Sequence, residues 1–152
     1  PATPAATACW GRMLQMMAEL ATATGRLDDA AQYAAQHLRV LRAFHAEFLR
    51  PDGRIGVDSH TGYILPLAFG LVPPALRQAA ADHLADNIRR RLGWDAGIAN
   101  RKGGKPKGMH WRTFWRLTAE HDRLVGASLE GMSEHLGIVR RGLDRLAGGL
   151  TP

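Results

Sequence analysis

Histidine and glutamate side chains that could do acid–base or metal chemistry occur along the chain without a catalytic spacing. His110, His121 and His135 are 11 and 14 residues apart, whereas two metal ligands on one helical face lie four residues apart. The glutamates offer no acid–base pair: Glu47, Glu120, Glu130 and Glu134. No P-loop, Gly-x-Gly-x-x-Gly run or Ser/His/Asp order is present. We therefore predict no metal site, no cofactor and no catalytic residue within the chain.

The composition of the 152 residues excludes further classes of protein. Cys9 is the only cysteine, so an internal disulfide is excluded and an idle thiol is expected. No run of about eighteen apolar residues exists, which excludes a transmembrane helix and makes a membrane partner unexpected. The stretch Pro1–Ala8 has neither the basic nor the apolar region of a signal peptide. We expect a cytoplasmic protein of about one domain.

Positive charge is concentrated in one stretch, residues 89–116. The formal net charge is +6, and this stretch contains nine basic residues against Asp95 alone. Such a block is typical either of a solvated linker or of a surface that binds nucleic acid or another polyanion. Cations and aromatic rings alternate here, as in single-strand binders. The polyanion-binding candidates are Lys105, Lys107, Arg112, Arg116, Trp111 and Trp115.

Apolar periodicity predicts helices throughout, so the expected fold class is all-α. The first helix carries an apolar stripe that includes Trp10, a predicted core residue, and Gly25 follows it as a left-handed cap. Pro66 interrupts the third helix and is expected to kink it. A turn at residues 51–53 separates two helical hairpins. The predicted helices cover residues 8–24, 27–49, 59–69, 74–91, 110–125, 128–136 and 139–146.

The run from Gly56 to Pro73, which includes Thr61-Gly62-Tyr63 and Phe69-Gly70-Leu71-Val72-Pro73, closely resembles a segment of bacterial α-L-rhamnosidases. The helices before and after this run are similar to the same family, so the resemblance covers residues 8–91. It implies helical hairpins that form part of an (α/α)6 toroid. It also implies hydrolysis of terminal α-L-rhamnosides with inversion, and a rhamnose-containing glycan as partner.

The resemblance places the start of the third helix at the sugar-binding funnel. Its substrate-binding candidates are Asp58, His60, Thr61 and Tyr63. Helix capping and packing are the alternative roles for these residues. Inverting hydrolysis needs a general acid and a general base about 6.5–9.5 Å apart. In the family both carboxylates lie outside the matching segment. The run Arg89–Asp95 shares Arg-Leu-Gly-Trp with the acid motif, but Arg90 replaces the glutamate, and we interpret this likeness as coincidence.

Three regions are therefore predicted: two hairpins over residues 8–91, a basic Gly-rich linker over 92–109, and a helical tail over 110–147. The main hypothesis is a segment of a rhamnosidase catalytic domain, inactive alone because both carboxylates are absent. The alternative is a small basic helical module that binds a polyanion through residues 89–116. Exposed hairpin faces would also allow self-association.

Overall fold

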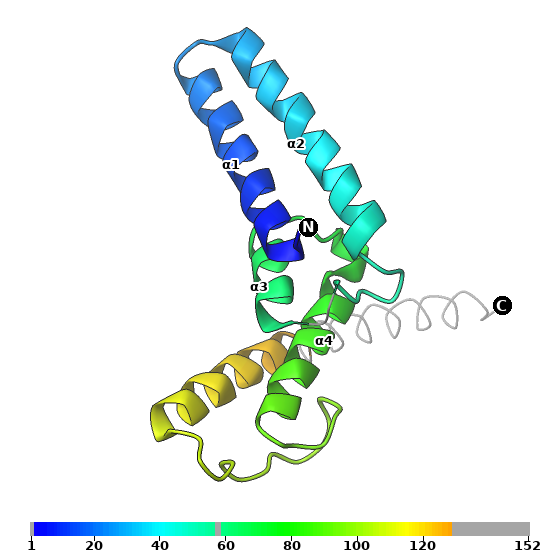
Figure 1. Cartoon of the computed structure of the whole chain (residues 1–152), viewed down its shortest axis with the longest axis vertical. Coiled ribbons are helices and arrows are strands. Elements are labelled where there is room, and N and C mark those ends of the chain that lie inside the picture. The colour runs from blue at the N-terminus through cyan, green and yellow to red at the C-terminus, as the bar shows by residue number, and fades with distance from the viewer. Residues whose placement is uncertain (1, 57–58, 129–152) are drawn as a thin grey trace, which may run out of the picture.

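A computed structural model of the chain describes residues 2–56 and 59–128. Four helices are labelled in Figure 1: α1 (Pro4–Ala23), α2 (Leu27–Phe48), α3 (His60–Ala68) and α4 (Pro74–Arg91). A further helical run covers residues 111–128. The fold class is all-α, as predicted. The helices predicted over 128–136 and 139–146 lie almost entirely outside the described residues.

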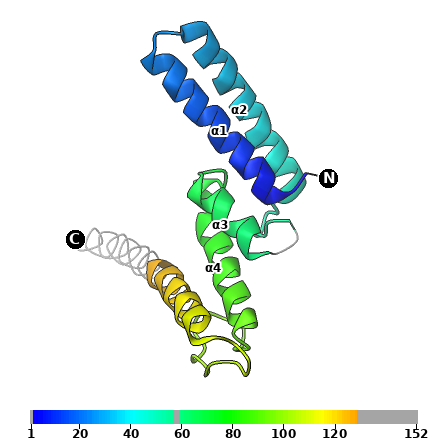
Figure 2. The same ribbon diagram turned by 60° about the vertical axis from the view of Figure 1, so that its left-hand side comes forward.

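Helices α1 and α2 form an antiparallel hairpin whose turn end projects away from the other helices, while its opposite end contacts α3 (Figures 1 and 2). Helix α1 begins four residues earlier than predicted because Thr3 caps it: the Thr3 hydroxyl accepts a hydrogen bond from the Ala6 amide at 3.2 Å. Pro4 occupies the first turn, where its missing amide proton costs nothing. The hairpin turns at Gly25, whose φ of +73° confirms the predicted left-handed cap.

The turn predicted at residues 51–53 is confirmed, and it returns the chain from α2 toward α4. The Arg50 amide donates to the Arg54 carbonyl at 2.9 Å, and the Gly56 amide donates to the Phe48 carbonyl at 2.8 Å. This short antiparallel pairing buries Ile55, which is 1% exposed. The pairing therefore fixes how the first hairpin joins the second.

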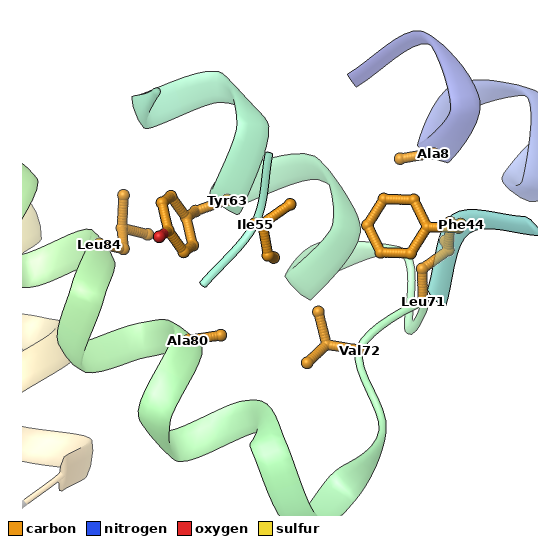
Figure 3. Close-up of a cluster of buried hydrophobic side chains, with 8 residues drawn as sticks. All are labelled: Ala8, Phe44, Ile55, Tyr63, Leu71, Val72, Ala80 and Leu84. Atoms are coloured by element: carbon orange, nitrogen blue, oxygen red, sulfur yellow. The ribbon is translucent and has the colours of Figure 1, made fainter. Parts of the chain in front are cut away.

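The main hydrophobic core lies where the ends of α1 and α2 meet α3 and α4 (Figure 3). Two half-buried histidines of α2 add contacts: the imidazole Nε2 of His45 lies 2.7 Å from the Leu71 carbonyl oxygen at the junction, and His37 Nδ1 lies 2.8 Å from the Gly11 carbonyl oxygen of α1. The rest of the arm formed by α1 and α2 contributes little to the core. The buried residues of the main core are Ala8, Phe44, Ile55, Tyr63, Leu71, Val72, Ala80 and Leu84.

A second hydrophobic cluster joins the end of α4 to the helical run 111–128 and includes Met109 at its edge. Leu92 and Trp94, from the segment expected as a linker, are 1% and 6% exposed in this cluster. The packing therefore begins inside the residues of the rhamnosidase resemblance and continues beyond them. Its buried members are Ile88, Leu92, Trp94, Phe114 and Leu117.

The structure bears on two sequence-based expectations, the burial of Trp10 and the lack of a membrane-spanning helix. The prediction that Trp10 belongs to the core is wrong, because its side chain is 50% exposed and lines an open groove between α1 and α2. Among the described helices, none is long and apolar enough to cross a membrane.

Gly53 is predicted to be indispensable for the junction. Its φ is +84°, and an added Cβ would lie 2.8 Å from the Ala79 Cβ and 2.9 Å from the Ala80 amide nitrogen of α4. We expect Gly53→Ala to lower the free energy of unfolding by about 2 kcal/mol or more, because backbone strain and overpacking add. Urea unfolding followed by circular dichroism measures this loss.

Gly25→Ala is the matched control, since Gly25 also has a positive φ but no atom lies within 4 Å of the added Cβ. It should cost about 1 kcal/mol, from strain alone. Equal losses in the two variants would contradict the role of close packing at Gly53.

Candidate functional site

The start of α3 is built by a side-chain cap. Ser59 has extended backbone angles, and its hydroxyl accepts a hydrogen bond from the Gly62 amide at 3.1 Å. A Cβ at residue 62 would lie 2.8 Å from that hydroxyl oxygen, so glycine keeps the cap accessible to the amide. This local geometry fixes the direction in which the following side chains leave the helix.

The four substrate-binding candidates have different surroundings. Asp58 lies outside the described residues, and Thr61 is exposed at the surface. Tyr63 is fully buried, with its ring beside Leu84 in Figure 3 and 6.3 Å from the His83 ring. In this structure Tyr63 is thus a core residue, whereas His60 and Thr61 lie near the surface. The structure does not gather these candidates around one cavity among the described residues.

His60 is half-buried beside a carboxylate from the run 111–128. Its Nε2 lies 3.3 Å from Glu120 Oε2, and the two side chains are 24% and 16% exposed. The His60 Nε2 atom is buried, and its geometry with Glu120 is not that of a hydrogen bond. An imidazole beside a carboxylate can bind a hydroxyl group or transfer a proton. Sequence reasoning missed this pair because no local pattern relates residues 60 positions apart.

A second polar group surrounds Arg89, which is completely buried at the end of α4. Its Nε donates to the Asp95 carbonyl, and its Nη2 donates to the Arg101 carbonyl at 2.9 Å. Its Nη1 lies 3.2 Å from His121 Nε2, and its guanidinium lies 5.6 Å from the Trp94 ring centre. All these contacts come from the loop after α4 or from the run 111–128. Arg89 therefore joins the two halves of the chain.

The charge network continues through His121 to the surface. Because a guanidinium can only donate, His121 Nε2 accepts, and its Nδ1 carries the proton that is donated to Asp122 Oδ1 at 3.1 Å. Lys102 Nζ also lies 2.7 Å from Asp122 Oδ1. Partial burial would raise the pKa of Asp122, but the hydrogen bonds from Lys102 and His121 outweigh it and lower that pKa. A cavity of about 300 Å³ opens beside these three residues.

The polyanion-binding candidates separate into internal and exposed groups. Lys105 is half-buried, and its ammonium donates to the Pro106 and Met109 carbonyls at 3.1 and 2.7 Å. The indole rings of Trp111 and Trp115 stack with centres 5.7 Å apart and planes at 22°, and they are 56% and 60% exposed. The three remaining cations are exposed: Lys107, Arg112 and Arg116. Only part of the basic stretch is thus available to a partner.

Within the described residues no group of three or more His, Cys, Asp or Glu side chains could hold a metal ion. Cys9 is exposed and is a free thiol.

Comparison with known proteins identifies the family. Residues 2–102 match the bacterial alpha-L-rhamnosidase 6 hairpin glycosidase domain, and the chain belongs to this family. The predicted resemblance over residues 8–91 is thus confirmed and extends somewhat at both ends. An alpha-L-rhamnosidase of Streptomyces avermitilis is 38% identical over 86 residues, which are 57% of this chain and 8% of the relative. No solved structure matches the chain.

The chain therefore spans less than a tenth of the length of that relative. Its helical run 111–128 lies outside the family match, yet it supplies Glu120 beside His60 and His121 beside Arg89. The site at the start of α3 thus combines residues of the family segment with residues that follow it.

Removal of the Arg89 side chain is predicted to disconnect the run 111–128 from α4. Arg89→Ala removes the hydrogen bonds to the Asp95 and Arg101 carbonyls and leaves a cavity where a fully buried side chain was, so we expect a loss of about 3 kcal/mol of unfolding free energy. Arg91→Ala, at an exposed position of the same helix end, should change stability by less than about 0.5 kcal/mol. Thermal and urea unfolding compare the two; similar small losses would refute the role of Arg89.

Proposed function

We propose that this chain is a segment of the catalytic domain of an inverting α-L-rhamnosidase, whose partner is a rhamnose-containing glycan. The observation that carries the proposal is the family match over residues 2–102. The relative from Streptomyces avermitilis, itself an alpha-L-rhamnosidase, supports it. Hydrolysis of a terminal α-L-rhamnoside is the reaction that this family assignment implies for the complete domain.

The start of α3 is the sugar-facing part of the segment in this proposal. His60 and Thr61 offer hydrogen-bonding groups near the surface, and Glu120 adds a carboxylate 3.3 Å from the His60 imidazole. Such side chains bind sugar hydroxyl groups because a hydroxyl group can donate to the Glu120 carboxylate and can both donate to and accept from the Thr61 hydroxyl. Tyr63 supports this surface from below, since its buried ring fills the core under α3.

The chain by itself is proposed to lack turnover. Inversion needs a protonated acid on one side of the glycosidic bond and a base that activates water on the other. The family resemblance places both carboxylates outside residues 8–91. Within the described residues, Glu120 is the carboxylate that is paired with His60, and no second carboxylate is paired with that histidine. A single carboxylate cannot supply both roles at once.

An aryl α-L-rhamnoside tests the proposal. The purified chain should release no aryl product above the buffer rate, and L-rhamnose titration followed by NMR should shift amide signals at the start of α3. His60→Ala should weaken rhamnose binding about fivefold to tenfold, the effect of one lost hydrogen bond. Turnover that disappears in Glu120→Gln would overturn the claim of inactivity.

The matched control is His110→Ala, which removes an exposed imidazole from the opposite end of the run 111–128. It should leave rhamnose binding unchanged. Absence of any rhamnose-dependent shift in the unaltered chain would count against the sugar-facing assignment of α3, and it would leave the family membership unaffected.

A second function is favoured by the exposed Trp111–Trp115 stack. We infer that this stack and the cations beside it, Lys107, Arg112 and Arg116, bind a polyanion such as single-stranded nucleic acid. Aromatic faces accept stacked bases, and the cations neutralise phosphates. Of the other basic side chains of this region, Arg89 and Lys105 donate to carbonyl groups within the protein, and the exposed Lys102 is paired with Asp122.

Salt dependence distinguishes this second function. Three phosphate contacts predict a slope of about −2 for the logarithm of the affinity against that of the salt concentration. Binding of a labelled single-stranded oligonucleotide should therefore weaken about 20-fold between about 50 and 200 mM salt. Trp115→Ala should weaken it at least about fivefold, whereas Leu38→Ala, at an equally exposed site on α2, should not. Salt-independent binding would refute it.

A further inference from the structure

The imidazole of His121 lies between a buried cation and a carboxylate nearer the surface. The His121 side chain is 2% exposed, and its Nε2 lies 3.2 Å from Arg89 Nη1 of α4. Its Nδ1 lies 3.1 Å from Asp122 Oδ1, and its ring packs edge-on against the Trp94 ring with centres 5.5 Å apart. Both ring nitrogens are therefore engaged within the protein, and each contact requires a defined protonation state.

Only the neutral imidazole fits this arrangement. A guanidinium has N–H donors and no acceptor, so His121 Nε2 must be unprotonated to receive the hydrogen bond from Arg89. A proton added at Nε2 would replace this hydrogen bond by two positively charged N–H groups whose nitrogens lie 3.2 Å apart. Arg89 is completely buried, so water neither replaces the lost acceptor nor screens the repulsion.

The other charges that face His121 do not reverse this preference. The Asp122 carboxylate attracts a proton to the ring, but the Lys102 ammonium lies 2.7 Å from the same carboxylate oxygen and offsets its charge. Arg89 and Lys102 together already exceed Asp122 by one positive charge, and a protonated His121 would add a second. The neutral ring is thus favoured by the group at closest buried contact and by the balance of charge around it.

We propose that His121 is a pH-sensitive latch between α4 and the run 111–128, closed when the imidazole is neutral and opened when a solvent proton binds to Nε2. The proton arrives through the cavity of about 300 Å³ that His121 lines together with Asp122 and Lys102. A histidine of an unfolded chain takes up this proton near about pH 6.5, whereas the closed latch must first give up the Arg89 contact. The contact is therefore complete above that pH and is lost as the pH falls.

Opening of the latch affects the loop that follows α4. Arg89 donates to three acceptors, which are the Asp95 carbonyl, the Arg101 carbonyl and His121 Nε2. Loss of the third acceptor leaves a buried donor unsatisfied, so the guanidinium moves toward water and its two carbonyl contacts weaken with it. The loop and the run 111–128 are thus released from α4 together.

A second histidine contact acts in the opposite direction. His60 of α3 lies 3.3 Å from Glu120, the residue before His121, and a protonated His60 is attracted to that carboxylate. Both side chains are partly exposed to solvent, at 24% and 16%, so this attraction is weaker than the repulsion at the fully buried Arg89. Acidification therefore separates the run 111–128 from α4 before it separates the run from α3.

Native-state hydrogen exchange of the full chain, corrected for the intrinsic pH dependence of exchange, tests the proposal. The amides of residues 114–124 should open about tenfold more at about pH 5.5 than at about pH 7.5, with the amides of α2 as internal reference. His121→Gln should abolish this increase, because a neutral amide side chain accepts from Arg89 and donates to Asp122 at every pH. An equal increase in His121→Gln, or none in the unaltered chain, would refute the latch.

The matched control is His83→Gln, which replaces another imidazole of α4, one whose Nε2 lies 3.1 Å from the Asp52 carbonyl oxygen. The tenfold increase should persist in this variant, and its loss would show that the titration of His121 is not the cause.

The Trp94 indole provides a second measurement that needs no variant of His121. Its Nε1 donates to the Gly104 carbonyl at 3.1 Å, and its ring packs against the His121 imidazole. The NMR signal of this N–H, assigned with Trp94→Phe, should shift or broaden over the same pH range, and an unchanged signal would overturn the proposal. None of these measurements involves rhamnose, so their outcome is separate from the test of the proposed function.

Discussion

The buried guanidinium of Arg89 is the constraint on which the second half of the structure depends. A charge taken out of water must recover its lost hydrogen bonds from the protein, or the fold loses several kcal/mol. The loop after α4 supplies two carbonyl groups, the run 111–128 supplies His121, and the Trp94 ring covers one face. The basic loop is therefore held in place, despite its glycines, because it closes around this side chain.

This constraint also shows why charge alone does not describe the basic stretch. Nine cations in residues 89–116 suggest one continuous positive surface. The structure instead uses Arg89 internally, pairs Lys102 with Asp122 and ties Lys105 to two carbonyl oxygens. A formal charge count contains no information about which cations are satisfied within the protein. That information comes from contacts between residues distant in sequence.

The helices were largely predictable because their determinants are local. Apolar periodicity, the Ser59 cap, Gly25 and the two prolines at the start of α4 act within a few residues of the boundaries that they set. The earlier start of α1 depended on Thr3, a cap in a small-residue stretch that showed no periodicity. The burial of Trp10 was predicted wrongly because an apolar stripe shows that a face needs covering, not whether this chain covers it. The His60–Glu120 contact was not predictable, since it depends on tertiary packing.

The helical run 111–128 has one face packed inside the protein and another exposed to solvent. Phe114 and Leu117 are committed to the cluster with Leu92 and Trp94, so that side fixes the helix against α4. The same packing carries Glu120 to His60 at the start of α3, which links the family segment to residues outside the family match. Trp111 and Trp115 lie on the remaining face and stack on each other in solvent. Both indoles also contact Phe114 at the edge of the cluster, and the Lys105 ammonium lies 5.2 Å from the Trp111 ring centre. Their inner edges are thus held by packing, while more than half of each side chain stays exposed.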